Sequence, residues 1–305
     1  MDVVRTPEER FTALPDFPYP PTHVTFDAGD GTMLRVAVVD TGPADGEVVL
    51  LLHGEPSWSF LWRRVIPELT AAGLRVVAPD LVGFGRSDKP TDPAAYSYAA
   101  HVEWMRQTLF EGLGLVDVTL VGQDWGGLIG LRLAAEHPDR FARVVVANTG
   151  LPTGDTPMSE AFLAWQRFAT AAPAFDVGRI VSNGTVTDLP PEVVAAYDAP
   201  FPDDASKAGA RVFPSLVPTA PDDPAAAANR AAWEVLARWE KPFLTAFSDA
   251  DPITGGGDRV FQRVVPGAQG APHTTLRGGG HFLQEDVGPE LGRVVAAFVA
   301  ATPRP

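Results

Sequence analysis

The sequence predicts an α/β protein built on a mostly parallel, doubly wound sheet, with a helical segment inserted between two sheet-forming halves. Short, continuous apolar runs alternate with helical patterns through the first half of the chain, which is typical of strands buried on both faces of a parallel sheet. The alternation stops near residue 152 and resumes near residue 222. Turns rich in glycine and polar residues follow several apolar runs, at the end of the strands where open α/β sheets bind their ligands.

The first half of the chain begins with an expected antiparallel hairpin, because the segments His23–Ala28 and Met33–Val39 flank the turn sequence GDG. The apolar runs and helical patterns that follow predict the sheet and helices of a doubly wound fold. They place strands at Val48–Leu52, Arg75–Ala78, Val118–Val121 and Arg143–Ala147, and helices at Ser57–Ala72, Tyr98–Gly112 and Gly126–Glu136.

Residues 153–221 interrupt this order, since they are helical in pattern, divided by prolines and without a strong strand. We expect them to form a cap over the carboxyl ends of the strands. Residues 1–152 and 222–305 would then form one α/β core domain. The second half of that core is expected to contain a helix at Asn229–Trp239, strands at Pro242–Phe247 and Thr274–Leu276, and a closing helix at Pro289–Ala301.

The charge and composition exclude several classes of function. The chain carries 38 acidic and 24 basic residues, for a formal net charge of −14, and such a surface repels nucleic-acid phosphates and anionic lipids. The absence of cysteine excludes disulfides, thiol nucleophiles and zinc–thiolate sites. The N-terminus is charged, and no apolar run reaches transmembrane length. We therefore expect a cytoplasmic protein with no nucleic-acid or membrane partner.

The strongest chemical signal is the turn Gly122-Gln123-Asp124-Trp125-Gly126, which lies between an expected buried strand and an expected helix. This G-x-nucleophile-x-G pattern is the nucleophile elbow of the α/β-hydrolase fold, and its glycines leave room for a tight, strained turn. Asp124 could instead only cap the helix, but the paired glycines favour the elbow. A carboxylate is ionised at neutral pH and attacks a saturated carbon directly, forming an ester.

Hydrolysis of such an ester requires a base and an acid that orients it. Of the six histidines, His281 in RGGGHFLQED lies near the C-terminus, where the order nucleophile, acid, histidine requires the base. In the sequence FSDADPIT both Asp251 and Asp249 follow an expected strand. We expect Asp251 to be the acid, with Asp249 as the alternative and the other as turn chemistry. Asn148 occupies the other possible acid position and cannot supply a negative charge.

The oxyanion formed during ester hydrolysis needs backbone N–H donors. Trp125, directly after the nucleophile, is expected to supply one, and Glu55 in the turn HGEP the other. The flanking Gly54 and Pro56 could instead mark only a tight exit from the strand. The side chain of Glu55 could also hold the hydrolytic water.

The motifs HGEPSWSFLW, DLVGFGRSDKP, VGQDWGG and DADPIT resemble the haloalkane dehalogenases, in particular the subgroup whose acid follows the later strand. The resemblance spans essentially the whole chain, and HGEP together with the elbow is more specific than the elbow alone. It implies hydrolysis of haloalkanes to alcohol, halide and a proton, through an alkyl ester of Asp124 that water activated by His281 cleaves. No cofactor or metal is required, and we expect a monomer whose partners are a small halogenated hydrocarbon and halide.

The same resemblance implies a halide site made of two indole N–H groups, from Trp125 and from Trp165 in SEAFLAWQRF. Halide leaves without protonation, so it needs donors in a dry pocket, where a charge-assisted hydrogen bond contributes roughly 1.5–3 kcal/mol. Trp165 could alternatively serve only to pack an amphipathic helix. The resemblance further places these residues around the substrate pocket: Phe162, Leu128, Phe213, Pro214 and Val217.

Two other classes of function remain open. An epoxide hydrolase would use the same nucleophile, but that family protonates its alkoxide leaving group with cap tyrosines, and residues 153–221 contain only Tyr197. A non-catalytic binding protein of this fold would be expected to lack the nucleophile, acid or base, and all three positions are filled. Nucleotide binding finds little support, since GFGRSD lacks the third glycine of a dinucleotide loop.

Overall fold

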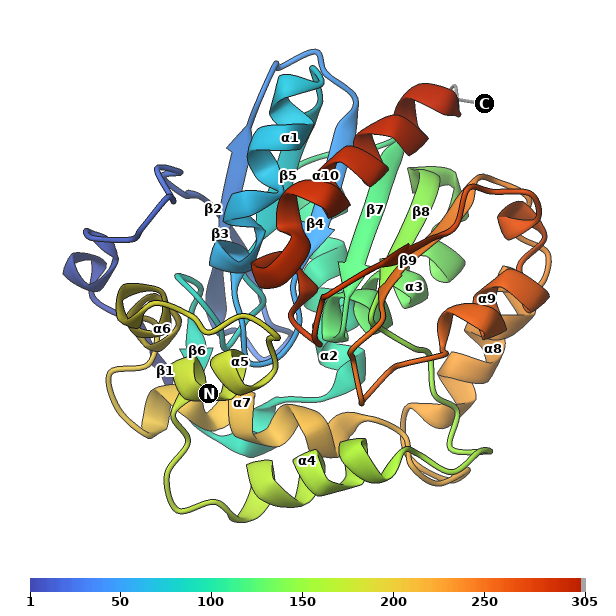
Figure 1. The fold of residues 1–305 in the computed structure, drawn as a ribbon. Coiled ribbons are helices and arrows are strands. Elements are labelled where there is room, and N and C mark those ends of the chain that lie inside the picture. The colour runs from blue at the N-terminus through green and yellow to red at the C-terminus, as the bar shows by residue number, and fades with distance from the viewer. Residues whose placement is uncertain (303–305) are drawn as a thin grey trace.

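An eight-stranded sheet forms the centre of the protein, with strand order β10-β9-β8-β7-β4-β5-β3-β2 (Figure 1). The computed structural model describes residues 1–302. Within this sheet β3 pairs antiparallel with β2 on one side and with β5 on the other, and the remaining neighbours are parallel. The predicted α/β class with a mostly parallel sheet is therefore confirmed.

The strands form where apolar residues follow one another without interruption. Every residue of β7, β8 and β9 is buried, as expected for central strands covered on both faces. A separate two-stranded sheet joins β1 to β6. The strand bounds are β1 Val3–Val4, β2 Thr22–Asp27, β3 Met33–Thr41, β4 Val48–Leu52, β5 Arg75–Pro79, β6 Lys89–Pro90, β7 Val118–Gln123, β8 Phe141–Ala147, β9 Phe243–Ser248 and β10 Thr274–Leu276.

Helices cover both faces of the sheet. One pair, α1 and α10, packs together on one face, and α3 packs between α2 and α8 on the other (Figure 1). The α-helices are α1 Ile66–Ala71, α2 Tyr98–Arg106, α3 Trp125–Glu136, α4 Glu160–Ala171, α5 Val177–Asn183, α6 Pro191–Asp198, α7 Ala208–Val212, α8 Ala226–Leu236, α9 Asp258–Val264 and α10 Leu283–Ala301. No helix within residues 1–302 is long and apolar enough to cross a membrane.

Prolines explain two differences from the predicted helices. The single helix expected at Ser57–Ala72 is a 3-10 helix, Ser59–Arg64, followed by α1. Pro67 lies in the first turn of α1, where its missing N–H costs nothing, but it cannot continue an earlier helix. The closing helix begins at Leu283, before the predicted start, and is kinked at Val287 ahead of Pro289.

Two further helical segments depart from the prediction. The helix expected at Tyr98–Gly112 changes from α2 to a π-helical turn, Gln107–Gly112. The short helix α9 after the acid loop was not predicted, because its seven residues carry little periodic signal.

Residues 153–221, called here the inserted segment, contain α4 to α7 and no strand. These helices lie together beyond one end of the sheet, below it in Figure 1. Phe162 of α4 and Asp124 at the end of β7 line the same cavity, so the inserted segment faces the carboxyl ends of the central strands.

Candidate active site

Asp124 occupies a sharp turn between β7 and α3 with φ 50° and ψ −126°. This backbone conformation is unfavourable for a residue with a side chain. A Cβ added at Gly126 would lie 1.9 Å from the carbonyl oxygen of Leu52, and one at Gly122 would lie 2.7 Å from the Cα of Gly127. Both elbow glycines are therefore required by the packing of the turn against its neighbours.

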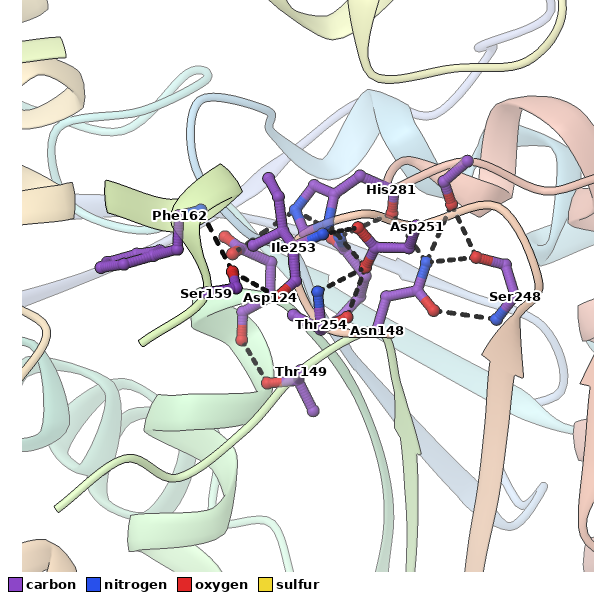
Figure 2. Close-up of polar contacts among 12 residues, drawn as sticks. Asp124, Asn148, Thr149, Ser159, Phe162, Ser248, Asp251, Ile253, Thr254 and His281 are labelled. Atoms are coloured by element: carbon purple, nitrogen blue, oxygen red, sulfur yellow. Dashed lines mark hydrogen bonds and ion pairs between the residues drawn. The ribbon is translucent and has the colours of Figure 1, made fainter. Parts of the chain in front are cut away.

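The structure brings Asp124, Asp251 and His281 together from three loops at one edge of the sheet (Figure 2). The Nδ1 atom of His281 lies 3.0 Å from Oδ2 of Asp251, and its Nε2 lies 3.5 Å from Oδ2 of Asp124. Asp251 and His281 are 6% and 5% exposed. A buried imidazole thus lies between two carboxylates, the arrangement that a nucleophile, base and acid require.

The geometry distinguishes between the two candidate acids. Asp249 is exposed, and its Oδ1 accepts the backbone N–H of Gly278 at 2.7 Å, which is turn chemistry. Asp251 accepts the N–H of Ile253 at 2.8 Å and the hydroxyl of Thr254, in addition to its contact with His281. These donors hold the carboxylate of Asp251 in a fixed orientation toward the imidazole.

The electrostatics of the group follow from this geometry. Burial alone would raise the pKa of Asp251, but the charge of His281 and the hydrogen bonds from His281 and Thr254 hold it at about 2. Burial alone would lower the pKa of His281, but Asp251 and Asp124 together raise it to about 10. The two carboxylates thus favour the charged form of the imidazole, and part of this effect comes from Asp124.

Glu55 contacts the nucleophile through its backbone, since its N–H donates to Oδ1 of Asp124 at 2.8 Å. Within residues 1–302 the structure shows no equivalent hydrogen bond from the N–H of Trp125. Burial, followed by the charge of Asp124, raises the pKa of the Glu55 side chain well above its ordinary value. Its Oε1 is buried and has no hydrogen-bond partner among the described residues.

A cavity of about 1030 Å³ opens in front of Asp124 and His281. Of the residues expected around the pocket and the halide site, it is lined by Glu55, Trp125, Leu128, Phe162, Trp165, Pro214 and Val217. The expectation that Phe213 lines the substrate pocket is corrected, because Phe213 does not line this cavity. The centroid of its ring lies 4.6 Å from that of Trp125 and 4.4 Å from that of His101. Phe213 therefore supports the indole of Trp125, and its neighbour Pro214 lines the cavity.

Both tryptophans expected at the halide site face this cavity. Trp125 is held edge-on by Tyr98 at 5.0 Å between ring centroids. Trp165 stacks on Phe168 at 5.7 Å, and its side chain lies close enough to Glu55 to oppose part of the rise in the pKa of that carboxyl. Trp165 therefore both packs within the inserted segment and lines the cavity near Glu55.

The sequence reasoning missed the residues that hold the three loops together. Asn148 is buried and has a positive φ of 40°. Its amide donates to the hydroxyl of Ser248 at 2.7 Å, the carbonyl of Gly280 at 2.8 Å and the carbonyl of His281 at 3.1 Å. Gln123 donates to the same His281 carbonyl at 3.1 Å. The only signal in the sequence was the position of Asn148 directly after a strand.

The described part of the chain contains no group of three or more histidine, aspartate and glutamate side chains placed to hold a metal ion.

Comparison with known proteins places this geometry in a family. A model of the α/β hydrolase fold family matches residues 47–254. A haloalkane dehalogenase of Psychrobacter cryohalolentis is 54% identical over 304 residues, covering 100% of both chains. Haloalkane dehalogenase 1 of Mycobacterium tuberculosis is 55% identical over 304 residues, covering 99% of this chain and 100% of that protein.

Solved structures agree with the sequence relatives. The tetrameric haloalkane dehalogenase DpaA of Paraglaciecola agarilytica superposes with a TM-score of 0.88 and 38% identity, over 96% of this chain and 97% of that one. Identity above half over full length, together with the shared fold, leads to one conclusion. This chain belongs to the haloalkane dehalogenases of the α/β hydrolase fold family.

Proposed function

We propose that the protein hydrolyses haloalkanes to an alcohol, a halide ion and a proton through a covalent ester of Asp124. The observation that carries this proposal is the position of the Asp124 carboxylate. It lines the same cavity as the indoles of Trp125 and Trp165, and it lies next to the buried pair of His281 and Asp251. Residues 153–221 act as the cap that completes the cavity over a core of residues 1–152 and 222–305.

In the first step a carboxylate oxygen of Asp124 attacks the carbon that bears the halogen. A carbon–oxygen bond forms as the carbon–halogen bond breaks, and its electron pair leaves with the halide. The N–H groups of Trp125 and Trp165 stabilise the developing negative charge, which no proton needs to neutralise.

In the second step His281 takes a proton from water, whose oxygen attacks the ester carbonyl of Asp124. The bond between that carbonyl carbon and the alkoxide oxygen then breaks, the imidazolium gives its proton to the leaving alcohol, and the carboxyl group of Asp124 loses its proton to solvent. The backbone N–H groups of Glu55 and Trp125 are proposed to stabilise the oxyanion. Esterification removes the negative charge and the hydrogen bond by which Asp124 raises the pKa of His281. The pKa of the imidazole therefore falls once the ester has formed, so that it can act as a base, while Asp251 stabilises the charge that the imidazole gains.

The epoxide hydrolase alternative lacks a tyrosine of the inserted segment at the cavity. The alkoxide leaving group of an epoxide needs a proton donor in the cavity. Tyr197, the tyrosine of the inserted segment, is fully buried, donates its hydroxyl to Glu285 and does not line the cavity. We expect no useful rate with epoxides.

Halide release from a set of 1-bromoalkanes, with styrene oxide as the competing substrate, tests the function. The expected result is catalytic release of bromide and no formation of diol from styrene oxide. Turnover of styrene oxide instead of the bromoalkanes would favour an epoxide hydrolase. Binding of bromoalkanes without turnover of either substrate would favour a non-catalytic protein.

The mouth of the cavity favours substrates with an extended apolar chain. Of the exposed large apolar residues within residues 1–302, Phe168, Val186 and Val260 all line it, with exposed fractions of 47%, 57% and 38%. Because each buried methylene contributes about 0.8 kcal/mol, we expect kcat/KM to rise at least about tenfold from bromoethane to 1-bromohexane.

Steady-state kinetics of Val186→Ser measure the contribution of this apolar mouth. The ratio of kcat/KM for 1-bromohexane to that for bromoethane is expected to fall. Val116→Ser is the matched control, because Val116 is 53% exposed and lies outside the cavity. An equal ratio in the two variants would contradict the prediction.

Halide binding by the paired indoles gives an optical prediction. Bromide is expected to quench tryptophan fluorescence in the wild type, and Trp165→Phe is expected to weaken bromide binding about tenfold or more, since one charge-assisted hydrogen bond is lost. Trp239→Phe is the control, because Trp239 does not line the cavity. Equal bromide affinity in both variants would show that Trp165 does not contribute to halide binding.

We further propose that the enzyme works as a monomer in the cytoplasm, with a small halogenated hydrocarbon and halide as its partners. The net charge of −14 supports the absence of a nucleic-acid partner. Light scattering of the purified protein distinguishes this state from a tetramer of the kind solved for DpaA.

A further inference from the structure

The carboxylate of Asp286, in the first turn of α10, joins two segments that lie far apart in the sequence. Its Oδ1 accepts the backbone N–H of Thr187 at 2.8 Å, and its two oxygens accept the N–H of Val186 at 3.2 and 3.1 Å. Its Oδ2 also accepts the N–H of Gly280, directly before the base His281, at 2.8 Å. Asp286 thus connects the inserted segment to the loop that carries the base.

An acidic side chain in the first turn of a helix usually stabilises the helix itself, through the free N–H groups and the dipole at that end. Asp286 differs, because the N–H groups that it accepts belong to Val186, Thr187 and Gly280, and none of these lies in α10. The contacts of this carboxylate therefore serve the segments around the active site.

Residues 184–187, called here the mouth segment, connect α5 to α6 at the mouth of the active-site cavity. Gly184, Thr185 and Val186 line that cavity. Within residues 1–302, the mouth segment receives hydrogen bonds from another part of the chain only at Phe282, whose N–H donates to the carbonyl of Gly184 at 3.2 Å, and at Asp286. Its place in the cavity wall thus depends largely on one carboxylate.

The mouth segment packs directly on the loop that carries the base. A Cβ added at Gly280 would lie 2.5 Å from the carbonyl oxygen of Gly184, and one added at Gly184 would lie 2.7 Å from the ring of Phe282. The two backbones can approach this closely only because both residues are glycine. A displacement of the mouth segment would therefore change the cavity wall beside the base.

The loop of the base has other partners that keep it in place. The carbonyl of Gly280 accepts the amide of Asn148 and the hydroxyl of Ser248, each at 2.8 Å, and the carbonyl of His281 accepts the amide of Asn148 at 3.1 Å. Loss of the Asp286 carboxylate is therefore expected to release the mouth segment and to leave the base in position.

We propose that Asp286 is a positioning residue that holds the mouth segment in the cavity wall, so that Val186 contacts the chain of a long substrate. The inference rests on the proposed hydrolysis of haloalkanes and concerns which of them the enzyme prefers. Without this carboxylate Val186 has no fixed place in the wall. A long alkyl chain then loses more contact than a short one.

Steady-state kinetics of Asp286→Ala test this role, with Asp249→Ala as the matched control. Asp249 also accepts an N–H of the loop that carries His281, from Gly278 at 2.7 Å, but it does not contact the mouth segment. In Asp286→Ala, the ratio of kcat/KM for 1-bromohexane to that for bromoethane should fall at least about threefold, the loss expected when about one methylene group is no longer buried. In Asp249→Ala the ratio should equal that of the wild type. In both variants kcat with bromoethane should change by less than about threefold.

Hydrogen exchange measures the position of the mouth segment independently of catalysis. In Asp286→Ala the amides of Val186 and Thr187 should exchange at least about tenfold faster, as expected when one charge-assisted hydrogen bond is lost. The amides of β7 should be unchanged, which shows that the fold is intact. Asp286→Asn keeps the shape of the side chain without its charge, so it should show the same changes to a smaller extent and serves if the alanine variant does not fold.

A double-variant cycle tests whether Asp286 acts through Val186. Val186→Ser lowers the same kinetic ratio, and the combination of Val186→Ser with Asp286→Ala should lower it no further than the more affected single variant. Effects that multiply in the double variant would contradict this route.

Failure of the proposed function would appear as an absence of bromide release by the wild type. Failure of this inference would appear in an active enzyme, as an equal substrate ratio in the wild type and in Asp286→Ala. Unchanged exchange at Val186 and Thr187 would overturn the inference whether or not the enzyme is active.

Discussion

Replacing Asp124 by asparagine is expected to lower kcat with bromoalkanes by at least about 10⁴-fold, the scale seen when a catalytic nucleophile is removed. The amide carries no negative charge and is a poor nucleophile, so the alkyl ester does not form. The variant should fold, because asparagine tolerates the positive φ of 50° at this turn and its oxygen can still accept the N–H of Glu55. Halide release under saturating substrate measures the effect.

A matched control for this substitution is Asp249→Asn. It makes the same chemical change at an exposed carboxylate, and the amide oxygen can still accept the N–H of Gly278. We expect activity within about threefold of the wild type, as for a surface substitution. Retention of activity by Asp124→Asn, with thermal unfolding unchanged, would remove Asp124 from the mechanism.

Replacing His281 by phenylalanine is expected to stop the cycle after its first step and leave the alkyl group attached to Asp124. The attack on carbon requires only the carboxylate and the halide site, whereas cleavage of the ester requires a base for water. The variant should release about one bromide per enzyme molecule in a burst and then stop. Intact-protein mass spectrometry should show a gain equal to the alkyl group less one hydrogen.

Peptide mapping of the trapped species should place the alkyl group on Asp124. The double variant Asp124→Asn with His281→Phe is the control and should show neither the burst nor the mass gain. If His281→Phe exposed to substrate yields no adduct while bromide is still released catalytically, the two-step mechanism is wrong.

The sheet could be predicted closely from sequence because its strands are uninterrupted apolar runs. Val48–Leu52 and Thr274–Leu276 were predicted with the observed bounds, and β7 and β8 extend beyond the prediction by two residues each at one end. Helix ends were less predictable. Pro67 lies where one expected helix is divided, and Pro289 follows the kink in the closing helix. Where such helices begin depends on the packing of the neighbouring turns, and the periodicity of apolar residues in the sequence carries no information about that packing.

For the candidate site too, sequence predicted one part and left another part to the tertiary structure. The types of residue in the elbow, the acid loop and the base loop predicted the chemistry, because a carboxylate between two glycines at the end of a buried strand has few other roles. Sequence favoured Asp251 as the acid but left Asp249 as an alternative, because the two are only two residues apart. The choice depended on which carboxylate points toward His281, and the backbone path of the β9–α9 loop decides that orientation.

Sequence by itself determined the α/β class and the relation to the dehalogenases, and it predicted the elbow with Asp124 as the nucleophile, because these depend on local pattern and residue type. Only the tertiary structure decided that Asp251 contacts the base, that Pro214 faces the cavity while Phe213 supports Trp125, and that Asn148 joins three loops. These features depend on distances between segments far apart in the chain, and the pattern of any one segment does not contain those distances.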